Sequence, residues 1–354
     1  MKLGKIAKID KNFAVKTNID RDGLVFRSVL DDVFSIHGVF YEDGCFRRLP
    51  QSVADRVNDG VKQLNLNTAG GRVRFITDSD YVAVNVKYNG VGKMPHFALT
   101  GSAGLDMYVN DGSGEEYVGT FTPPFDVKDK YESVLDIGKK ERLITIDLPT
   151  YSGVSELYIG LRDGCVLKKA PAYPNALPVV FYGSSITQGG CCSRPGNTYQ
   201  QILSRELNFD YVNLGFSGSA RAEDVISDYI AAMEMSVFVY DYDHNAPTPE
   251  HLAATHEKMY RNIRAAHPEL PIVMLTRPKF HLYGDEPERL EIVKRTYENA
   301  VAAGDENVYF IPGPGLIGEG LREVATVDNC HPNDAGFFSM AHALKPLMEK
   351  ILRN

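Results

Sequence analysis

Residues suited to acyl transfer follow apolar segments in the second half of this 354-residue chain. Ser185 comes just after the apolar run 178–183, while Asp328 and His331 stand three residues apart before Pro332. At that spacing an aspartate can bond one imidazole nitrogen while the other nitrogen faces a serine hydroxyl. A nucleophile, its base and the residue that orients the base are the groups that acyl transfer requires.

Further residues could stabilise the oxyanion of such a reaction. Gly218, in the loop 215–219, allows a backbone N–H to approach a substrate closely. Asn245, in the loop 241–247, carries an amide donor, and the backbone N–H of Ser185 could face the same oxygen. The loss of one such donor typically slows catalysis by about 100- to 1,000-fold.

The segments that position these residues form a repeating pattern from Pro178 onward. The predicted strands are Pro178–Gly183, Tyr211–Gly215, Val237–Tyr242, Ile272–Thr276 and Val308–Ile311. The predicted helices are Thr198–Asn208, Ala222–Met235, Pro249–His267, Glu286–Ala303 and Asp334–Leu352. Strand followed by helix, repeated in this way, indicates a parallel sheet with helices on both faces, whose ligands bind beyond the carboxyl ends of the strands. We therefore expect the candidate residues to meet at one edge of this sheet.

The first half of the chain has a different texture. From residue 71 onward, short β-rich runs separated by turn residues predict a β-sandwich or jelly roll. The runs are Arg72–Thr77, Tyr81–Lys87, Leu105–Val109, Glu116–Phe121, Leu143–Leu148 and Glu156–Leu161. The pattern before about residue 60 is mixed and assigns no element. Three prolines make Lys168–Pro178 a candidate linker, which places the domains at 1–172 and 173–354.

Four blocks in the second domain resemble the signature blocks of the SGNH (GDSL-type) hydrolases and occur in that family's order. They are Gly183-Ser-Ser-Ile-Thr187, Asn213-Leu-Gly-Phe-Ser-Gly218, Asp241-Tyr-Asp-His-Asn245 and Asp328-Asn-Cys-His-Pro332. The resemblance implies a nucleophile at Ser185, oxyanion donors at Ser185, Gly218 and Asn245, and a base and orienter at His331 and Asp328. Two blocks depart from the family. Ser184 replaces its acidic residue, and the third block lacks the usual Gly-x-Asn-Asp form.

The same resemblance implies a fold and a reaction. The family fold is a flavodoxin-like α/β domain with a five-stranded parallel sheet in three layers. An all-β domain before it is similar to two-domain carbohydrate esterases with an N-terminal jelly roll. The implied function is a serine esterase that removes acetyl groups from a carbohydrate or polysaccharide. We keep two alternatives: an esterase for small or lipid acyl esters, and a non-catalytic carbohydrate-binding protein.

Structural roles compete with the functional ones at each position. Serines in a βα loop often cap a helix, and Asp328 could be only a local cap, since some two-domain relatives use a Ser–His dyad. Asn245 could be a turn residue, and Gly215, Thr187 and Gln188 are expected to shape loops. Asp241, Asp243 and His244 are more often capping or hydrogen-bonding groups than metal ligands. His281 and Tyr283 could line the substrate mouth, with a surface loop as the default.

Composition excludes several classes of protein. The chain is 44% hydrophobic and 24% charged, with no apolar run near the roughly 18 residues of a membrane span. The net charge of −8 lies wholly in residues 177–354, which argues against nucleic acid and anionic membranes as partners. Neither a cofactor nor a metal is expected; the partner is an acyl ester substrate, and the oligomeric state stays open.

Cysteines and the N-terminus leave two questions open. The cysteines at 45, 165, 191, 192 and 330 are too few for a disulfide scaffold. Cys191 and Cys192 are expected in a loop or the core, and Cys330 as a small packed residue. Residues 1–8 lack the apolar segment of a signal peptide, so both a cytoplasmic and an exported location remain open.

Overall fold

The computed structural model describes residues 15–279 and 281–353, which form two compact units. The first unit comprises the chain up to Arg47, Leu66–Ala172 and Arg194–Gly196. The second comprises Arg48–Asn65, Tyr173–Ser193 and Asn197–Asn354. The chain thus passes between the units several times, which a division into two consecutive segments cannot represent. The N-terminal residues considered for a signal peptide lie outside the described residues.

The first unit contains two larger antiparallel sheets and a hairpin. One sheet has the spatial order β1 (Leu24–Ser28), β11 (Gly153–Arg162), β6 (Tyr81–Gly90), β9 (Lys130–Asp136). The other has the order β12 (Leu167–Lys169), β5 (Arg72–Thr77), β10 (Arg142–Asp147), β7 (Leu105–Asn110), β8 (Glu115–Phe121), and β2 (Ser35–His37) also pairs with β5. The hairpin is β3 (Phe40–Glu42) with β4 (Cys45–Arg47), and a short helix α4 covers Leu99–Ser102.

One apolar core joins the two larger sheets. Val82, Val84 and Val86 of β6 are fully buried in it, together with Phe75 of β5 and Ile144 of β10. The predicted alternation along β6 is confirmed, because the intervening Asn85 and Lys87 are more exposed. Burial of both inner faces is what holds a β-sandwich together.

β1 to β4 lie in the part of the sequence whose pattern assigns no element, and after residue 71 two more strands, β9 and β12, are not predicted. β9 pairs on one side only, with β6, and Tyr131 is its one buried residue, so it shows no apolar alternation. β12 has only three residues, pairs with the end of β5 and overlaps the start of the segment predicted as a linker. Edge strands of this kind carry little hydrophobic signal.

The second unit is built on a five-stranded parallel sheet of spatial order β14-β13-β15-β16-β17. The strands are β13 (Val179–Gly183), β14 (Tyr211–Gly215), β15 (Val237–Asp241), β16 (Ile272–Leu275) and β17 (Val308–Ile311). In chain order this is 2-1-3-4-5, the flavodoxin-like arrangement, whose binding crevice opens between the first and third strands. The predicted α/β fold is therefore confirmed.

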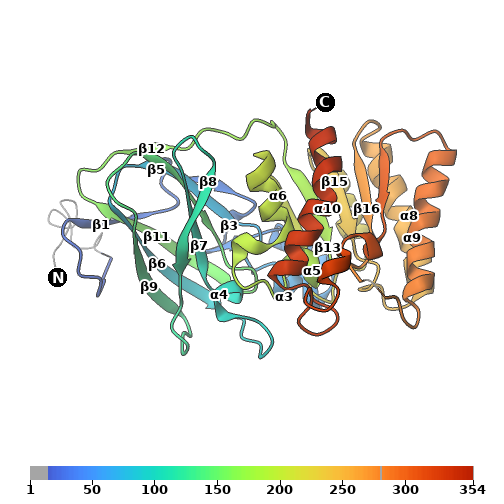
Figure 1. The fold of residues 1–354 in the computed structure, drawn as a ribbon, viewed down its shortest axis with the longest axis horizontal. Coiled ribbons are helices and arrows are strands. Elements are labelled where there is room, and N and C mark those ends of the chain that lie inside the picture. Colours follow the sequence, from blue (N-terminus) through green and yellow to red (C-terminus); the bar gives the residue numbers. More distant parts are fainter. Residues whose placement is uncertain (1–14, 280, 354) are drawn as a thin grey trace. The chain divides into compact units, whose positions relative to one another are not determined.

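Helices cover both faces of this sheet, which makes three layers (Figure 1). The helices after β13 are α5 (Ser185–Gln188), α6 (Tyr199–Leu207), α7 (Asp224–Ala231), α8 (Pro249–Ala266), α9 (Glu286–Ala302) and α10 (Asp334–Arg353). The 3₁₀ turns are η3 (Gly313–Gly315), η4 (Glu319–Leu321) and η2 (Pro195–Asn197), of which η2 lies mostly in the first unit. α6 and α10 lie side by side, and Tyr199 of α6 packs between Phe181 of β13 and Phe337 of α10. The opposite face carries Tyr182, which shares its core with α7, α8 and α9.

Two helices from the N-terminal third of the chain complete that opposite face. α2 (Gln51–Val57) and α3 (Asp59–Leu64) bury Ala54 and Val61 in the same core as Tyr182. Their sequence is short and mixed, so only the tertiary contact reveals where they belong. α7 also differs from its prediction: it begins at Asp224, because Ala222 has a left-handed φ of 55° that no helix start accommodates. Within the described residues, no helix is long and apolar enough to cross a membrane.

Arg48 fastens these two helices to the end of β14. Arg48 is 2% exposed, and its guanidinium donates to the carbonyls of Leu64, Asn213 and Gly215. It also lies 4.5 Å from the centroid of the Phe216 ring. A buried cation that satisfies three carbonyls is costly to remove, since each carbonyl then loses its donor.

We predict that Arg48→Met lowers the free energy of unfolding by about 2–4 kcal/mol, because three buried carbonyls lose a charged donor. Urea unfolding of the whole chain, followed by circular dichroism, measures the change. Arg56→Ala is the matched control, since Arg56 is an exposed residue of α2 and should cost less than about 0.5 kcal/mol. Equal stability of the two variants would contradict this role of Arg48.

Candidate active site

The nucleophile turn is the short connection between β13 and α5. β13 ends at Gly183, and Ser184 caps α5 by accepting a hydrogen bond from Ile186 N–H at 3.1 Å. Ser185 is the first helical residue and is 6% exposed. The cap explains what Ser184 does at the position where the family has an acidic residue. It leaves Ser185 as the serine at the carboxyl edge of the sheet.

The base and its orienter come from the loop before α10. Asp328 Oδ1 accepts the backbone N–H groups of Cys330 and His331 at 3.1 and 2.8 Å. Its Oδ2 lies 2.8 Å from Nδ1 of His331. Asn329 has a φ of 62°, the left-handed value that asparagine tolerates better than most residues. This tight turn brings the carboxylate beside the ring, and Pro332 pairs with Thr326 just before α10 begins.

The two segments meet through a single contact. Nε2 of His331 lies 2.9 Å from Oγ of Ser185, although the residues are 146 positions apart. With Asp328 bonded to the other ring nitrogen, the imidazole is held in the orientation and tautomer that a general base for Ser185 needs. The structure therefore brings together the three residues that the sequence nominated for catalysis.

The candidate oxyanion donors Gly218 and Asn245 differ in whether their N–H groups already have a hydrogen-bond partner. Gly218 has a φ of 66°, and a Cβ there would meet no described atom within 4 Å. Its N–H forms no hydrogen bond within the part of the chain that is described. The Asn245 amide donates to the Phe216 carbonyl at 3.0 Å, which ties the third loop to the second. One amide hydrogen of Asn245 thus has a structural partner, and the oxyanion roles of Ser185, Gly218 and Asn245 stay predictions.

Gly215 and Gln188, which are expected to shape loops, contact the loops next to them. A Cβ at Gly215 would lie 2.2 Å from the backbone nitrogen of Gln188, so only glycine allows this close approach. The side chain of Gln188 accepts the backbone N–H of Ser217 at 3.0 Å. Tyr283 is 60% exposed and its ring lies 6.5 Å from that of His281, which fits a surface loop. Phe280 of that loop lies outside the described residues.

Electrostatics couple the catalytic residues to a thiol. Partial burial disfavours the Asp328 carboxylate, but the hydrogen bonds from His331 outweigh it and lower the Asp328 pKa. A hydrogen bond with Cys330 raises the pKa of His331 to about 9. Asp328 adds to this increase, and partial burial opposes it. Burial opposes ionisation of Cys330, yet its contact with His331 lowers the thiol pKa. Cys330 is thus more than a packed small residue, because it stabilises the protonated imidazole.

The other cysteines play no comparable part. All five cysteines are described and all are free thiols. Cys191 and Cys192 are buried, as expected, and burial raises the pKa of Cys191 to about 12. Thiols of this kind are poorly nucleophilic at neutral pH, because the thiolate is the reactive form.

The same loop offers ligand atoms that a metal could use. Donor atoms of Asp328, Cys330 and His331 lie within 4.8 Å of one another. Both ring nitrogens of His331 are already hydrogen-bonded, to Asp328 and Ser185. An ion would therefore compete with the contacts that acyl transfer requires, and the expectation of no metal or cofactor stays a prediction.

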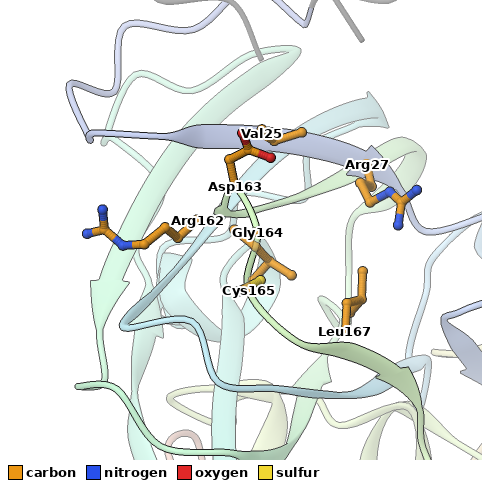
Figure 2. A pocket seen from close by; sticks show the side chains of 8 residues that line it. Val25, Arg27, Arg162, Asp163, Gly164, Cys165 and Leu167 are labelled. Atoms are coloured by element: carbon orange, nitrogen blue, oxygen red, sulfur yellow. The ribbon is translucent and has the colours of Figure 1, made fainter. Parts of the chain in front are cut away.

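The first unit has a pocket of its own, shown in Figure 2. Its lining is Val25, Arg27, Leu161, Arg162, Asp163, Gly164, Cys165 and Leu167. Arg162 pairs with Asp80 at 2.7 Å and Arg27 with Asp31 at 3.6 Å, and Figure 2 shows the two arginines directed to opposite sides. Burial raises the pKa of the Cys165 thiol. No histidine is among these lining residues, so they offer no nucleophile with an adjacent base.

Comparison with protein families agrees with this geometry. Residues 176–349 match the GDSL-like lipase/acylhydrolase family. Residues 24–167 match a family described as the N-terminus of SGNH-hydrolase-type esterases. The chain belongs to the SGNH (GDSL-type) hydrolase family. It is accordingly placed among the ester hydrolases.

Several solved structures share the fold of this chain. A protein assigned as a GDSL-like lipase from Bacteroides ovatus has a TM-score of 0.83 at 26% identity, over 93% of this chain and 98% of its own. The salicylyl-acyltransferase SsfX3 of a tetracycline biosynthetic pathway has a TM-score of 0.75 at 21% identity, over 94% and 98%. A family two carbohydrate esterase from Clostridium thermocellum has a TM-score of 0.57 at 17% identity, over 80% and 93%. No curated protein matches the chain.

Sequence reasoning missed two features of the site. Cys330 was assigned a packing role, although its position next to His331 was the available signal. Asp241 and Asp243 were correctly expected to be hydrogen-bonding groups, but their partners were not foreseen. Asp241 bonds Ser184 N–H at 3.2 Å, and Asp243 bonds Arg277 N–H at 3.1 Å. Such partners depend on which strands are neighbours, which the sequence does not state.

We predict that Cys330→Ala moves the acidic limb of the kcat/KM pH profile to lower pH by about one unit, since the protonated imidazole loses a stabilising partner. His331 must be neutral to act as a base, so activity rises as the pH passes through its pKa. The profile is measured on p-nitrophenyl acetate.

Cys165→Ala is the matched control, because it removes a half-buried thiol whose partner is Thr77 in the first unit. It should leave the limb in place. An unchanged limb in Cys330→Ala would show that the thiol does not affect the base.

Proposed function

We propose that the protein is a serine esterase that removes acetyl groups from a carbohydrate or polysaccharide. The observation that carries the esterase assignment is the unbroken hydrogen-bonded chain from Ser185 Oγ through His331 to Asp328, at 2.9 and 2.8 Å. A non-catalytic binding protein would have no need to keep all three groups in register. The geometry therefore favours a catalyst over the binding alternative.

The mechanism follows from the positions of the atoms. Ser185 Oγ attacks the ester carbonyl carbon while its proton passes to Nε2 of His331, and Asp328 stabilises the resulting imidazolium. The N–H groups of Ser185 and Gly218 and the Asn245 amide are the proposed donors to the oxyanion. His331 returns the proton to the departing alkoxide, which leaves an acyl group on Ser185. Water then repeats the sequence and frees the acid.

The acetyl-carbohydrate substrate rests on likeness of fold. Besides the Clostridium thermocellum enzyme, an acetyl xylan esterase from Butyrivibrio proteoclasticus has a TM-score of 0.57 at 13% identity, over 93% of this chain. Both are well below the identity at which a substrate can be inferred from a relative. The higher structural similarity to an acyltransferase supports the second candidate, an enzyme for small acyl esters.

Ser185→Ala should reduce kcat on p-nitrophenyl acetate by about 1,000-fold or more, as the loss of a serine nucleophile does elsewhere. Ser184→Ala is the control. It removes a neighbouring hydroxyl that caps α5 and should cost about 1 kcal/mol of stability while most of the activity remains. Activity in Ser185→Ala equal to that of the wild type would refute the nucleophile assignment.

The substrate class is tested with a series of acyl lengths and with polymers. We expect kcat/KM to fall from p-nitrophenyl acetate through butyrate to octanoate, and acetate to be released from acetylated xylan or acetyl sugars. A preference for octanoate, or acetate release from p-nitrophenyl acetate alone, would reject the carbohydrate proposal and favour small or lipid esters.

A further inference from the structure

A buried carboxylate lies directly beneath the nucleophile turn. Asp241 is the last residue of β15 and is 2% exposed. β15 pairs in parallel with β13, and their register sets Asp241 opposite Gly183. From there Asp241 Oδ1 accepts the Ser184 N–H at 3.2 Å and also the hydroxyl of Thr187. Asp241 Oδ1 therefore holds residues on both sides of Ser185, which carries the nucleophilic hydroxyl.

Gly183 shows that the local sequence accommodates this carboxylate. A Cβ at position 183 would lie 1.6 Å from Asp241 Oδ1 and 2.5 Å from Thr187 Oγ1. Any side chain there would occupy the place of the carboxylate oxygen. A glycine is thus required at position 183, because any side chain there would block the carboxyl group of Asp241 from the turn.

The bonds that Asp241 accepts have no access to water as a substitute. Ser184 and Thr187 are both fully buried. A buried donor that loses its acceptor costs more than an ordinary hydrogen bond contributes, so the turn would rearrange rather than stay in place. Because Ser185 lies between the two anchored residues, a rearrangement would redirect its Oγ away from His331.

We propose that Asp241 is the positioning residue of the nucleophile turn, acting as the shared acceptor for Ser184 N–H and Thr187 O–H. It touches no reacting atom and acts through Ser185, so the inference rests on the proposed function. In this chain Ser184 stands where the family has an acidic residue, and the carboxyl group of Asp241 reaches the same turn from the neighbouring strand instead. The third signature block, through Asp241, thus supplies the carboxyl group that the first block lacks at Ser184.

The protonation state of Asp241 adds a distinguishing feature. Burial, aided by the nearby charge of Asp243 and opposed by the Thr187 hydrogen bond, raises the Asp241 pKa to about 8. Tyr199 of α6 is the other titratable group that faces it. Asp241 Oδ2 forms no hydrogen bond with the described residues. Near neutral pH the side chain is thus mainly a neutral acid, with one oxygen left to accept both bonds.

A neutral acid and an amide present the same acceptor, which makes two substitutions informative. In Asp241→Asn the amide oxygen can accept both bonds, so kcat should stay within about threefold of wild type. In Asp241→Ala both bonds are lost, and we expect kcat to fall by about 10- to 100-fold with KM nearly unchanged. The assay substrate is p-nitrophenyl acetate.

A second readout follows Ser185 directly. The rate at which a fluorophosphonate labels Ser185 should fall in Asp241→Ala by the same factor as kcat, after correction for the folded fraction. Thr296→Val is the matched control. It breaks a buried hydrogen bond between Thr296 and His256 at 2.9 Å, and should lower stability without changing the labelling rate. If Asp241→Ala does not fold, Thr187→Val removes one of the two bonds and should show a smaller loss of kcat.

Three results would overturn the inference. The first is a wild-type labelling rate in folded Asp241→Ala, or in Thr187→Val if the former does not fold. The second is an equal loss in Asp241→Asn and Asp241→Ala, which would mean that charge and not the acceptor matters. The third is a matching loss in Thr296→Val. Failure of the proposed function has a different signature: the wild-type protein would hydrolyse none of the esters, while the effect of Asp241→Ala on labelling of Ser185 would persist.

Discussion

The site depends on the loop that follows β15 near the middle of the parallel sheet. Asp241 holds the backbone of the first loop at Ser184, Asp243 holds the fourth loop at Arg277, and Asn245 holds the second at Phe216. Parallel strands end at a common edge, but their loops have no reason to keep a fixed spacing by themselves. Side chains from one central loop impose that spacing on three others.

The turn that carries the base has further hydrogen bonds of its own. Asp328 and His331 are held by their own turn, with hydrogen bonds of 2.8 Å to the carboxylate. The catalytic contact between His331 and Ser185 therefore joins two turns that are each held by hydrogen bonds. Its length is set by how well both turns are positioned, which is why residues that touch no substrate can limit the rate. Cys330 adds a chemical influence to this geometry, since its hydrogen bond raises the pKa of the imidazole.

Much of the second unit could be predicted, because its signals are local. Apolar runs such as Val237–Asp241 are buried on both faces and stand out from the helices between them. The first and last signature blocks could be paired across 146 residues, since βα loops share one edge of a sheet. The first unit was harder, and β9 was missed because only one of its residues is buried.

What the sequence could not reveal is set by contacts between distant segments. α2 and α3 pack on the second unit through Ala54 and Val61, and no local pattern says so. The reach of Asp241 to Ser184 depends on β15 being the neighbour of β13. Likewise Asn245 carries the right amide for an oxyanion donor, yet only the fold shows that this amide also binds the Phe216 carbonyl.

Catalysis by this site requires that Ser185 form a covalent acyl intermediate with His331 as its base. The most direct measurement is peptide mapping by mass spectrometry after brief exposure to p-nitrophenyl acetate and an acid quench. We predict one acetyl group on the peptide that contains Ser185, and its absence in His331→Ala. Acetyl on another residue of the wild type, or hydrolysis with no acetylated peptide under conditions that trap such intermediates, would contradict it.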